Sequence, residues 1–148
     1  MSRRGFTMIE MLMVIVIISI MVLIAYPKVT SAMVQNNVRS ARTTLANMFA
    51  KGRTVATQTS RKTRLVFNGN QVWVVATPRL TGAGTFDTVG AIENLNAVYG
   101  VTVTSPVDSI KFDPRGLAAG FGVPVTFKVA KSGHTDSIVV DGLGRVTK

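Results

Sequence analysis

Side chains that could carry out chemistry are few in this sequence, and they form no convincing catalytic set. There is no cysteine, which excludes a thiolate nucleophile or thiolate metal site. Ser132, His134 and Asp136 supply the residue types of a hydrolase triad, but neighbours on one short turn rarely converge correctly. Gly82-x-Gly84 is too short for a phosphate-binding loop. We therefore expect a protein that is not an enzyme.

Oxygen ligands for a hard cation are also scarce. The candidates are four aspartates of the second half: Asp108, Asp113, Asp136 and Asp141. Their spacing matches no calcium-binding loop of the EF-hand type. Because aspartate commonly caps turns, we expect that role for them, and we expect neither a metal site nor a cofactor.

One carboxylate stands out by its surroundings. Glu10 lies inside an apolar run from Phe6 to Tyr26, which is long enough as a helix to cross a hydrocarbon core of about 30 Å. A carboxylate at membrane depth costs a few kcal/mol if unpaired, so such residues are usually functional. Arg3 and Arg4 precede the run, which predicts a cytoplasmic N-terminus and a single pass.

An ordinary secretory signal is the competing interpretation of this segment. Such a signal also has a basic start, but it is cleaved after its apolar stretch at a small-residue site. Here Tyr26, Pro27 and Lys28 follow the stretch and make a poor site. A discarded peptide also has no reason to keep Glu10. We therefore favour a retained anchor.

The segment Gly5-Phe6-Thr7-Met8-Ile9-Glu10 resembles the signal of type IV prepilins and pseudopilins. The resemblance implies that a prepilin peptidase cuts between Gly5 and Phe6 and then N-methylates Phe6. It also implies that Glu10 acts in assembly, by pairing with the freed ammonium of a neighbouring subunit, and Pro27 sits where the family often has proline. Gly5 suits such a cut, because an extended backbone without a side chain enters a protease cleft easily.

Beyond the apolar run, residues 28 to 58 predict an amphipathic continuation of the helix. Apolar or small residues recur at alternating spacings of four and three and form one seam. The seam consists of Val34, Val38, Ala41, Leu45, Met48, Gly52 and Val55. We expect Pro27 to bend or loosen the helix, and the seam to pack on a sheet.

From Arg61 onward, the apolar period changes to two and predicts an antiparallel β-rich head. Two strands flank the turn Asn68-Gly69-Asn70, and the stretch from Thr77 to Leu95 is expected to be irregular. The predicted strands are Thr63–Phe67, Gln71–Val75, Ala97–Thr104, Ser109–Phe112, Val123–Val129, Ser137–Val140 and Arg145–Thr147. The fold class is thus α+β, with a leader at 1–5, an apolar helix at 6–27, its continuation at 28–58 and a head at 59–148.

Net charge is +10 and is distributed unevenly. No carboxylate occurs between Met11 and Phe86, whereas that stretch carries nine basic residues. They are Lys28, Arg39, Arg42, Lys51, Arg53, Arg61, Lys62, Arg64 and Arg79. Such a stripe suits an anionic partner, and it suits equally a solvated surface that keeps the protein soluble.

The second half resembles the minor pseudopilin H of type II secretion and FimT-like minor pilins, the GspH/FimT group. The segments that carry this resemblance are Arg64–Phe67, Ile110–Gly116 and Ile138–Val146. It implies a pilin fold and a filament subunit, anchored in the bacterial inner membrane with its head outside the cytoplasm until it enters a periplasmic or surface filament. The implied partners are the prepilin peptidase and other pilin or pseudopilin subunits.

Three functional hypotheses remain open at this point. The first is a structural or initiating subunit of a secretion pseudopilus or type IV pilus. The second is a DNA-binding minor pilin in DNA uptake, because FimT-like pilins bind DNA through basic residues that include a C-terminal Gly-Arg element. The residues that could serve here are Arg61, Lys62, Arg64, Lys128, Lys131, Arg145 and Lys148. The third is a single-pass membrane protein that never assembles.

Overall fold

The computed structural model describes residues 5–78, 86–119 and 124–147. The chain divides into two compact units, Met1–Val34 (unit 1) and Gln35–Lys148 (unit 2). The boundary between them falls within helix α1, Met8–Thr59. Lys148 and the leader residues 1–4 lie outside the described residues.

In unit 2, α1 has the buried seam that its periodicity predicts. The buried residues of α1 are Val38, Ala41, Leu45, Met48, Phe49, Gly52 and Ala56. Val34, the last residue of unit 1, and Val55 are only half-buried, while Phe49 and Ala56 widen the predicted seam. The seam packs on strands, as expected: Gly52 lies so close to β5 (Ser109–Phe112) that a Cβ added there would be 3.2 Å from the Phe112 ring.

Sheet A has the strand order β3-β2-β1-β5-β6, with every pair antiparallel. Its strands other than β5 are β1 (Thr63–Asn68), β2 (Gln71–Ala76), β3 (Asp87–Asn94) and β6 (Ala118–Ala119). The predicted β1–β2 hairpin is confirmed, because Asn68 pairs with Gln71 across a turn in which Gly69 has a φ of 58°. Thr63 fixes the start of β1 by donating its hydroxyl to the Gly52 carbonyl at 2.9 Å.

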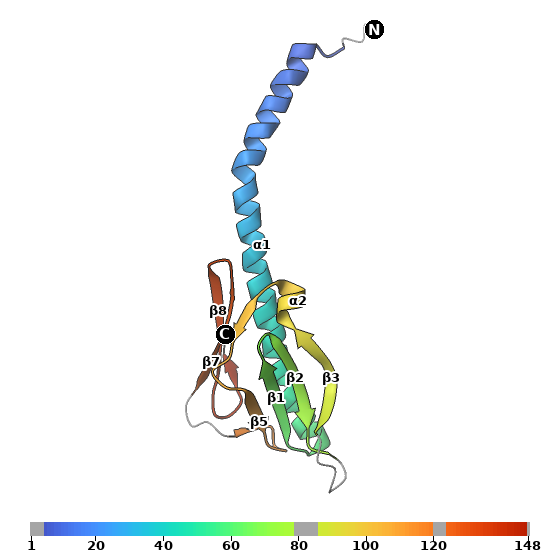
Figure 1. The fold of residues 1–148 in the computed structure, drawn as a ribbon, viewed down its shortest axis with the longest axis vertical. Coiled ribbons are helices and arrows are strands. Elements are labelled where there is room, and N and C mark those ends of the chain that lie inside the picture. The colour runs from blue at the N-terminus through green and yellow to red at the C-terminus, as the bar shows by residue number, and fades with distance from the viewer. Residues whose placement is uncertain (1–4, 79–85, 120–123, 148) are drawn as a thin grey trace. The chain divides into compact units, whose positions relative to one another are not determined.

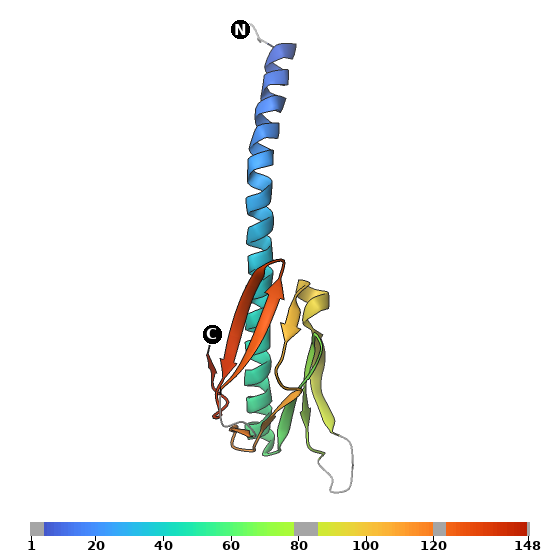
Figure 2. The ribbon, with the colours of Figure 1, turned by 60° about the vertical axis from the view of Figure 1, so that its left-hand side comes forward.

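Sheet B has the order β4-β7-β8-β9 and is also antiparallel. Its strands are β4 (Thr102–Thr104), β7 (Val125–Lys131), β8 (His134–Val140) and β9 (Val146–Thr147). Ser132 and Gly133 form the β7–β8 turn, both at positive φ. Figures 1 and 2 show the two sheets beside the part of α1 that belongs to unit 2.

Three phenylalanines join the layers of unit 2. Phe49 of α1 lies edge-on to Phe127 of β7, with ring centroids 5.1 Å apart, and 6.0 Å from Phe67 of β1. Phe67 and Phe127 stack at 4.9 Å. Because each ring comes from a different layer, this cluster fixes the helix and both sheets in one core.

Besides shifted strand ends and the unpredicted two-residue strand β6, two segments differ from the prediction. Thr77–Leu95 was expected to be irregular, yet its residues 87–94 form the edge strand β3. Its burial does not alternate, and Gly90 at a φ of 86° interrupts it, so the period-two signal is missing. Ala97–Thr104 was expected to be one strand, but Leu95–Tyr99 forms a short helix, α2. The Asn94 side chain caps that helix and Gly100 ends it in the left-handed conformation.

Candidate functional site

The proposed cleavage site lies in accessible chain. Gly5 and Phe6 precede the first residue of α1 and are exposed, and the Phe6 side chain is 77% exposed. A peptidase needs a reachable backbone, and Gly5 and Phe6 are exposed and lie outside the helix.

Thr7 and Glu10 form a capping box at the start of α1. The Glu10 amide donates to Thr7 Oγ1 at 3.3 Å, and the Thr7 amide donates back to Glu10 Oε2 at 3.5 Å. This role was not predicted from the sequence, although threonine followed three residues later by glutamate, ahead of an apolar run, is the usual signal for it. The Glu10 carboxylate therefore accepts from the backbone amide of Thr7, the residue that caps its own helix.

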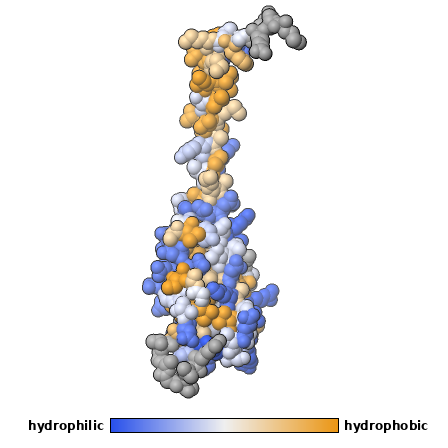
Figure 3. All heavy atoms as spheres, turned by 90° about the vertical axis from the view of Figure 1, so that its right-hand side faces the viewer, coloured by the Kyte–Doolittle hydropathy of each residue, from blue (hydrophilic) through white to orange (hydrophobic). Residues whose placement is uncertain are grey.

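The apolar part of α1 in unit 1 is uncovered. No residue described between 5 and 34 is buried, and the large apolar side chains from Phe6 to Met33 are 43–85% exposed. By length and composition, α1 contains the one stretch among the described helices that could cross a membrane. Ser19 returns its hydroxyl to the Ile15 carbonyl at 2.8 Å, so this polar group is satisfied within the helix. Figure 3 shows the hydrophobic side chains along this stretch.

Pro27 does not interrupt α1. The helix continues through it from Met8 to Thr59, so any loosening at the proline does not break the helix. The Thr30 hydroxyl donates to the carbonyls of Tyr26 and Pro27 at 3.2 and 3.0 Å, so it supplies local hydrogen bonds next to the proline.

The basic residues chosen from the sequence fall into separate places. Arg61, Lys62 and Arg64 come together where α1 ends and β1 begins. Lys128 is exposed on β7, whereas Lys131, at the end of that strand, donates Nζ to the Tyr99 carbonyl at 2.6 Å. Among the described residues, the structure therefore does not join the predicted cations into one stripe, and Lys148 lies outside the part of the chain that it describes.

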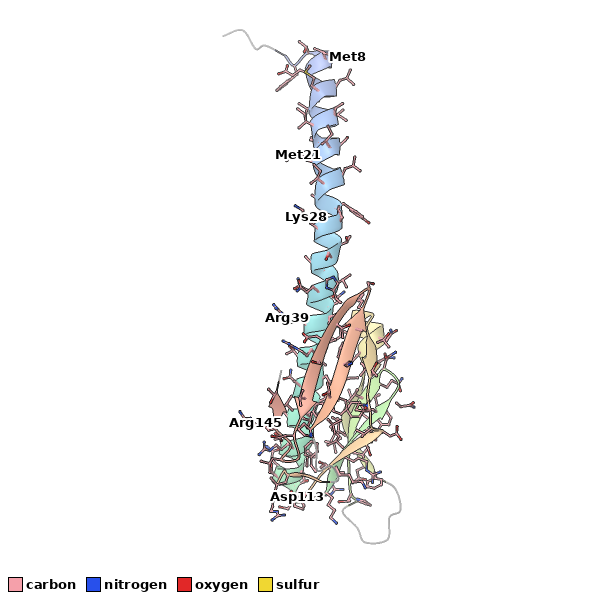
Figure 4. The ribbon with its side chains drawn as sticks, turned by 90° about the vertical axis from the view of Figure 1, so that its left-hand side faces the viewer. Met8, Met21, Lys28, Arg39, Asp113 and Arg145 are labelled. Atoms are coloured by element: carbon pink, nitrogen blue, oxygen red, sulfur yellow. The ribbon has the colours of Figure 1, made fainter. Side chains whose placement is uncertain are left out.

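Arg145 lies at the end of unit 2 where α1 also ends, and its side chain is exposed (Figure 4). The preceding Gly144 is structural: it has a φ of 74°, and an added Cβ would lie 3.1 Å from Phe112 Cε1 and 3.3 Å from the Ala118 amide nitrogen. The Gly-Arg element is thus a tight turn that displays an arginine.

Two of the aspartates considered as cation ligands instead cap equivalent loops. Asp113 Oδ1 accepts from the amides of Arg115 and Leu117, both at 2.9 Å, and Asp141 Oδ1 accepts from those of Leu143 and Arg145, at 3.0 and 2.8 Å. The turn-capping prediction is confirmed for both. The Leu117 amide, followed by the Arg115 side chain and amide, lowers the pKa of the Asp113 carboxyl below its usual range against a smaller opposing effect of desolvation.

Asp136 has a different partner. Its carboxylate accepts from Arg42 Nη1 of α1 at 2.9 Å through Oδ2 and from the Ser137 amide at 2.9 Å through Oδ1. This ion pair connects α1 to β8. Within the described residues, no three His, Cys, Asp or Glu side chains gather in a way that could hold a metal ion.

A pocket of about 340 Å³ opens beside the basic group at the start of β1. Its lining residues are Lys62, Thr63, Arg64, Thr77, Phe86, Lys111, Phe112 and Asp113. Lys111 enters because β1 pairs with β5, which places it directly opposite Arg64. Arg61 is adjacent in sequence but is neutralised, since its Nη2 lies 2.6 Å from Asp87 Oδ2. We refer to this cavity as the basic pocket.

Comparison with known proteins gives two findings. A family model described as the prokaryotic N-terminal methylation motif matches residues 1–26. Two crystal structures of the type IV minor pilin FimU of Pseudomonas aeruginosa, strain PAO1, are similar in fold. One has a TM-score of 0.60 at 16% identity, covering 76% of this chain and 87% of FimU. The other has a TM-score of 0.56 at 15% identity, with coverages of 74% and 90%. No curated protein matches the sequence.

The chain thus combines an N-terminal methylation motif at residues 1–26 with the α+β pilin fold. The similar solved structures are of a minor pilin, and at these identities their likeness concerns the fold. The proposed membership of the GspH/FimT group rests on the sequence segments alone.

Proposed function

We propose that this chain is a minor pilin, a non-enzymatic filament subunit that waits in the bacterial inner membrane and is assembled through α1. The observation that carries the proposal is the uncovered apolar surface of α1 in unit 1, directly after an N-terminal methylation motif. Such a surface requires lipid or neighbouring helices, because large apolar patches on soluble monomers are uncommon. A filament core supplies helices, and the membrane supplies lipid beforehand.

Processing comes first in this proposal. A prepilin peptidase cuts between Gly5 and Phe6 on the cytoplasmic side and methylates the new amino group of Phe6. In the filament, that ammonium and the Glu10 carboxylate of a neighbour neutralise each other, which favours one axial register. The capping box supports this arrangement, because Glu10 already lies at the helix start, one turn from the new terminus.

We favour a type IV pilus over a secretion pseudopilus as the filament to which this subunit belongs. The support is the likeness in fold to FimU, which is a type IV minor pilin. The DNA-uptake alternative has less support, since Arg61 and Lys131 have partners within the chain and Lys128 lies apart from the basic pocket.

The test is co-expression of the full chain with a prepilin peptidase, followed by intact-mass measurement. The expected product lacks residues 1–5 and carries one added methyl group. Gly5→Val should remain uncut, because a branched side chain obstructs the cleft, whereas Gly133→Val, in an exposed turn far along the chain, should be cut normally. An uncut wild-type chain would refute the processing step and, with it, the filament role.

A further inference from the structure

The basic pocket contains more positive charge than its surroundings balance. Lys62, Arg64 and Lys111 line it, and none of them forms an ion pair among the described residues. The segments outside the described residues contain no aspartate or glutamate that could supply one. Three cations around one cavity repel each other, and an anion bound among them would offset that repulsion.

The one carboxylate in the lining is already engaged. Both oxygens of Asp113 are bound within their own loop, Oδ1 by two backbone amides and Oδ2 by Arg115 Nε at 3.0 Å. Asp113 shapes the rim of the pocket and leaves the three cations available to a ligand.

Arg64 is held in a defined orientation with a free donor. Its Cζ lies 4.9 Å from the centroid of the Phe86 ring, a cation–π arrangement that fixes one face of the guanidinium. Its Nε is buried without a hydrogen-bond partner. Because Nε itself is buried, a bound carboxylate would accept charge-assisted hydrogen bonds from the outer nitrogens of the guanidinium.

The shape of the pocket indicates what carries the anion. Phe86, whose side chain is 47% exposed, forms an apolar wall beside the cations, and the volume of about 340 Å³ suits one or two side chains. A nucleic-acid backbone is recognised by cations spread along an open surface, and here they converge on a single cavity. An acidic side chain next to an apolar one satisfies both parts of the lining.

A second copy of this chain is a poor source for that ligand. Each copy carries a net charge of +10, so copies repel one another. Most of its acids are also in use: Asp87, Asp113 and Asp136 are in ion pairs, and Asp141 caps its loop. The charge pattern therefore points to a different, acidic partner.

We propose that the basic pocket is a docking site for an acidic–apolar segment of another protein, whose carboxylate binds Arg64, Lys62 and Lys111 while its apolar neighbour packs against Phe86. The identity of the partner rests on the proposed function: it is a different subunit of the same filament. The head would then select its neighbour by charge, in addition to the contacts that the N-terminal helices make.

The test measures the fluorescence anisotropy of rhodamine-labelled probes as they are titrated with the full chain in maltoside micelles. The probes are a short peptide of alternating Glu and Phe, the same peptide with Gln for Glu, and a single-stranded oligonucleotide. The Glu–Phe peptide should bind best, and Arg64→Gln should weaken it about tenfold, the usual effect of losing a charge-assisted hydrogen bond. Arg39→Gln is the matched control, because Arg39 is an exposed arginine of α1 outside the lining; it should change affinity less than about twofold.

Further variants keep the outcome decisive. Near-ultraviolet circular dichroism checks that Arg64→Gln is folded, and Lys111→Gln, at an exposed side chain, gives the same test if it is not. Equal weakening by Arg64→Gln and Arg39→Gln would refute the proposal, since attraction would then be general. Tighter binding of the oligonucleotide, or undiminished binding of the Gln peptide, would also refute it. Peptide binding requires no cleavage, so the mass measurement and this titration fail independently.

Discussion

The two parts of α1 contrast in how their apolar residues are used. In unit 1, the apolar side chains surround the helix and, except for the half-buried Val34 at its end, are exposed, whereas in unit 2 they lie mainly on one seam and are buried. Both parts are helical with similar local signals, so secondary structure does not separate them. What differs is how the apolar side chains are distributed around the helix axis. A seam on one side can be buried against sheets of the same chain, whereas a helix that is apolar all round needs lipid or other helices around it.

The largest expected effect concerns Glu10, at the start of the exposed apolar part of α1. Replacing Glu10 with Ala should abolish filament assembly, because an ammonium buried beside neighbouring helices would lose its counterion, at about 3–5 kcal/mol per contact. The measurement is the amount of subunit in sheared filaments, with Glu93→Ala as a control on β3. Thr7→Ala separates the two roles of Glu10, since it removes the cap and keeps the carboxylate. Normal assembly of Glu10→Ala would contradict the pairing.

The next effect concerns the buried part. Phe49→Ala should lower the free energy of unfolding of unit 2 by about 3–5 kcal/mol, because it empties the junction between α1 and the two sheets. Ile15→Ala, at a side chain 57% exposed in unit 1, should change it by less than about 0.5 kcal/mol. Denaturant titration in detergent measures both. Similar losses of unfolding free energy for the two variants would contradict the contrast between the buried and the exposed apolar residues of α1.

A smaller effect tests how closely unit 2 is packed. Gly144→Ala should destabilise by about 1–3 kcal/mol through its positive φ, and by more through contact with Phe112 and Ala118. Gly133 also has a positive φ, of 83°, but a Cβ added there would have no atom within 4 Å, so Gly133→Ala is the comparison. The difference between their melting temperatures therefore measures crowding alone, and no difference would mean that the turn relaxes freely.

The smallest expected effect depends on pH. Asp113 has a lowered pKa in the folded state, so its stabilisation is complete above the unfolded pKa of about 3.9 and declines as pH falls from there through the folded value. Asp113→Asn should lower the melting temperature slightly at pH 7 and flatten its dependence on pH below about 4. Asp108→Asn, at an exposed aspartate, is the control. An unchanged acid profile for Asp113→Asn would contradict the assignment.

Sequence patterns predicted the parts of the fold whose signals are local. The α1 seam and the β1–β2 hairpin follow from period and turn chemistry. Edge strand β3 was missed because exposure on both faces and Gly90 remove its alternation, and α2 because five residues between Asn94 and Gly100 resemble a strand in composition. Capping by Thr7 and Glu10 could have been predicted, since its signal is explicit.

The basic pocket could not have been predicted in the same way. Arg61, Lys62 and Arg64 were chosen as a charged group, but Lys111 joins them only through the pairing of β1 with β5. Phe86 was taken as part of an irregular segment, and its ring over Arg64 depends on the course of β3. Sites assembled from strands distant in sequence require the strand order, which local periodicity does not contain.

That strand order also has a consequence for how the head folds. In sheet A, β1 and β2 meet through a two-residue turn, whereas β1 and β5 join residues as far apart as Thr63 and Phe112. Closing the longer loop costs more chain entropy before any contact rewards it, so we expect the hairpin to form early and β5 to dock late. Before β5 docks, one edge of β1 is unpaired and can pair with strands of other chains. We therefore expect aggregation to be most frequent at this stage of folding.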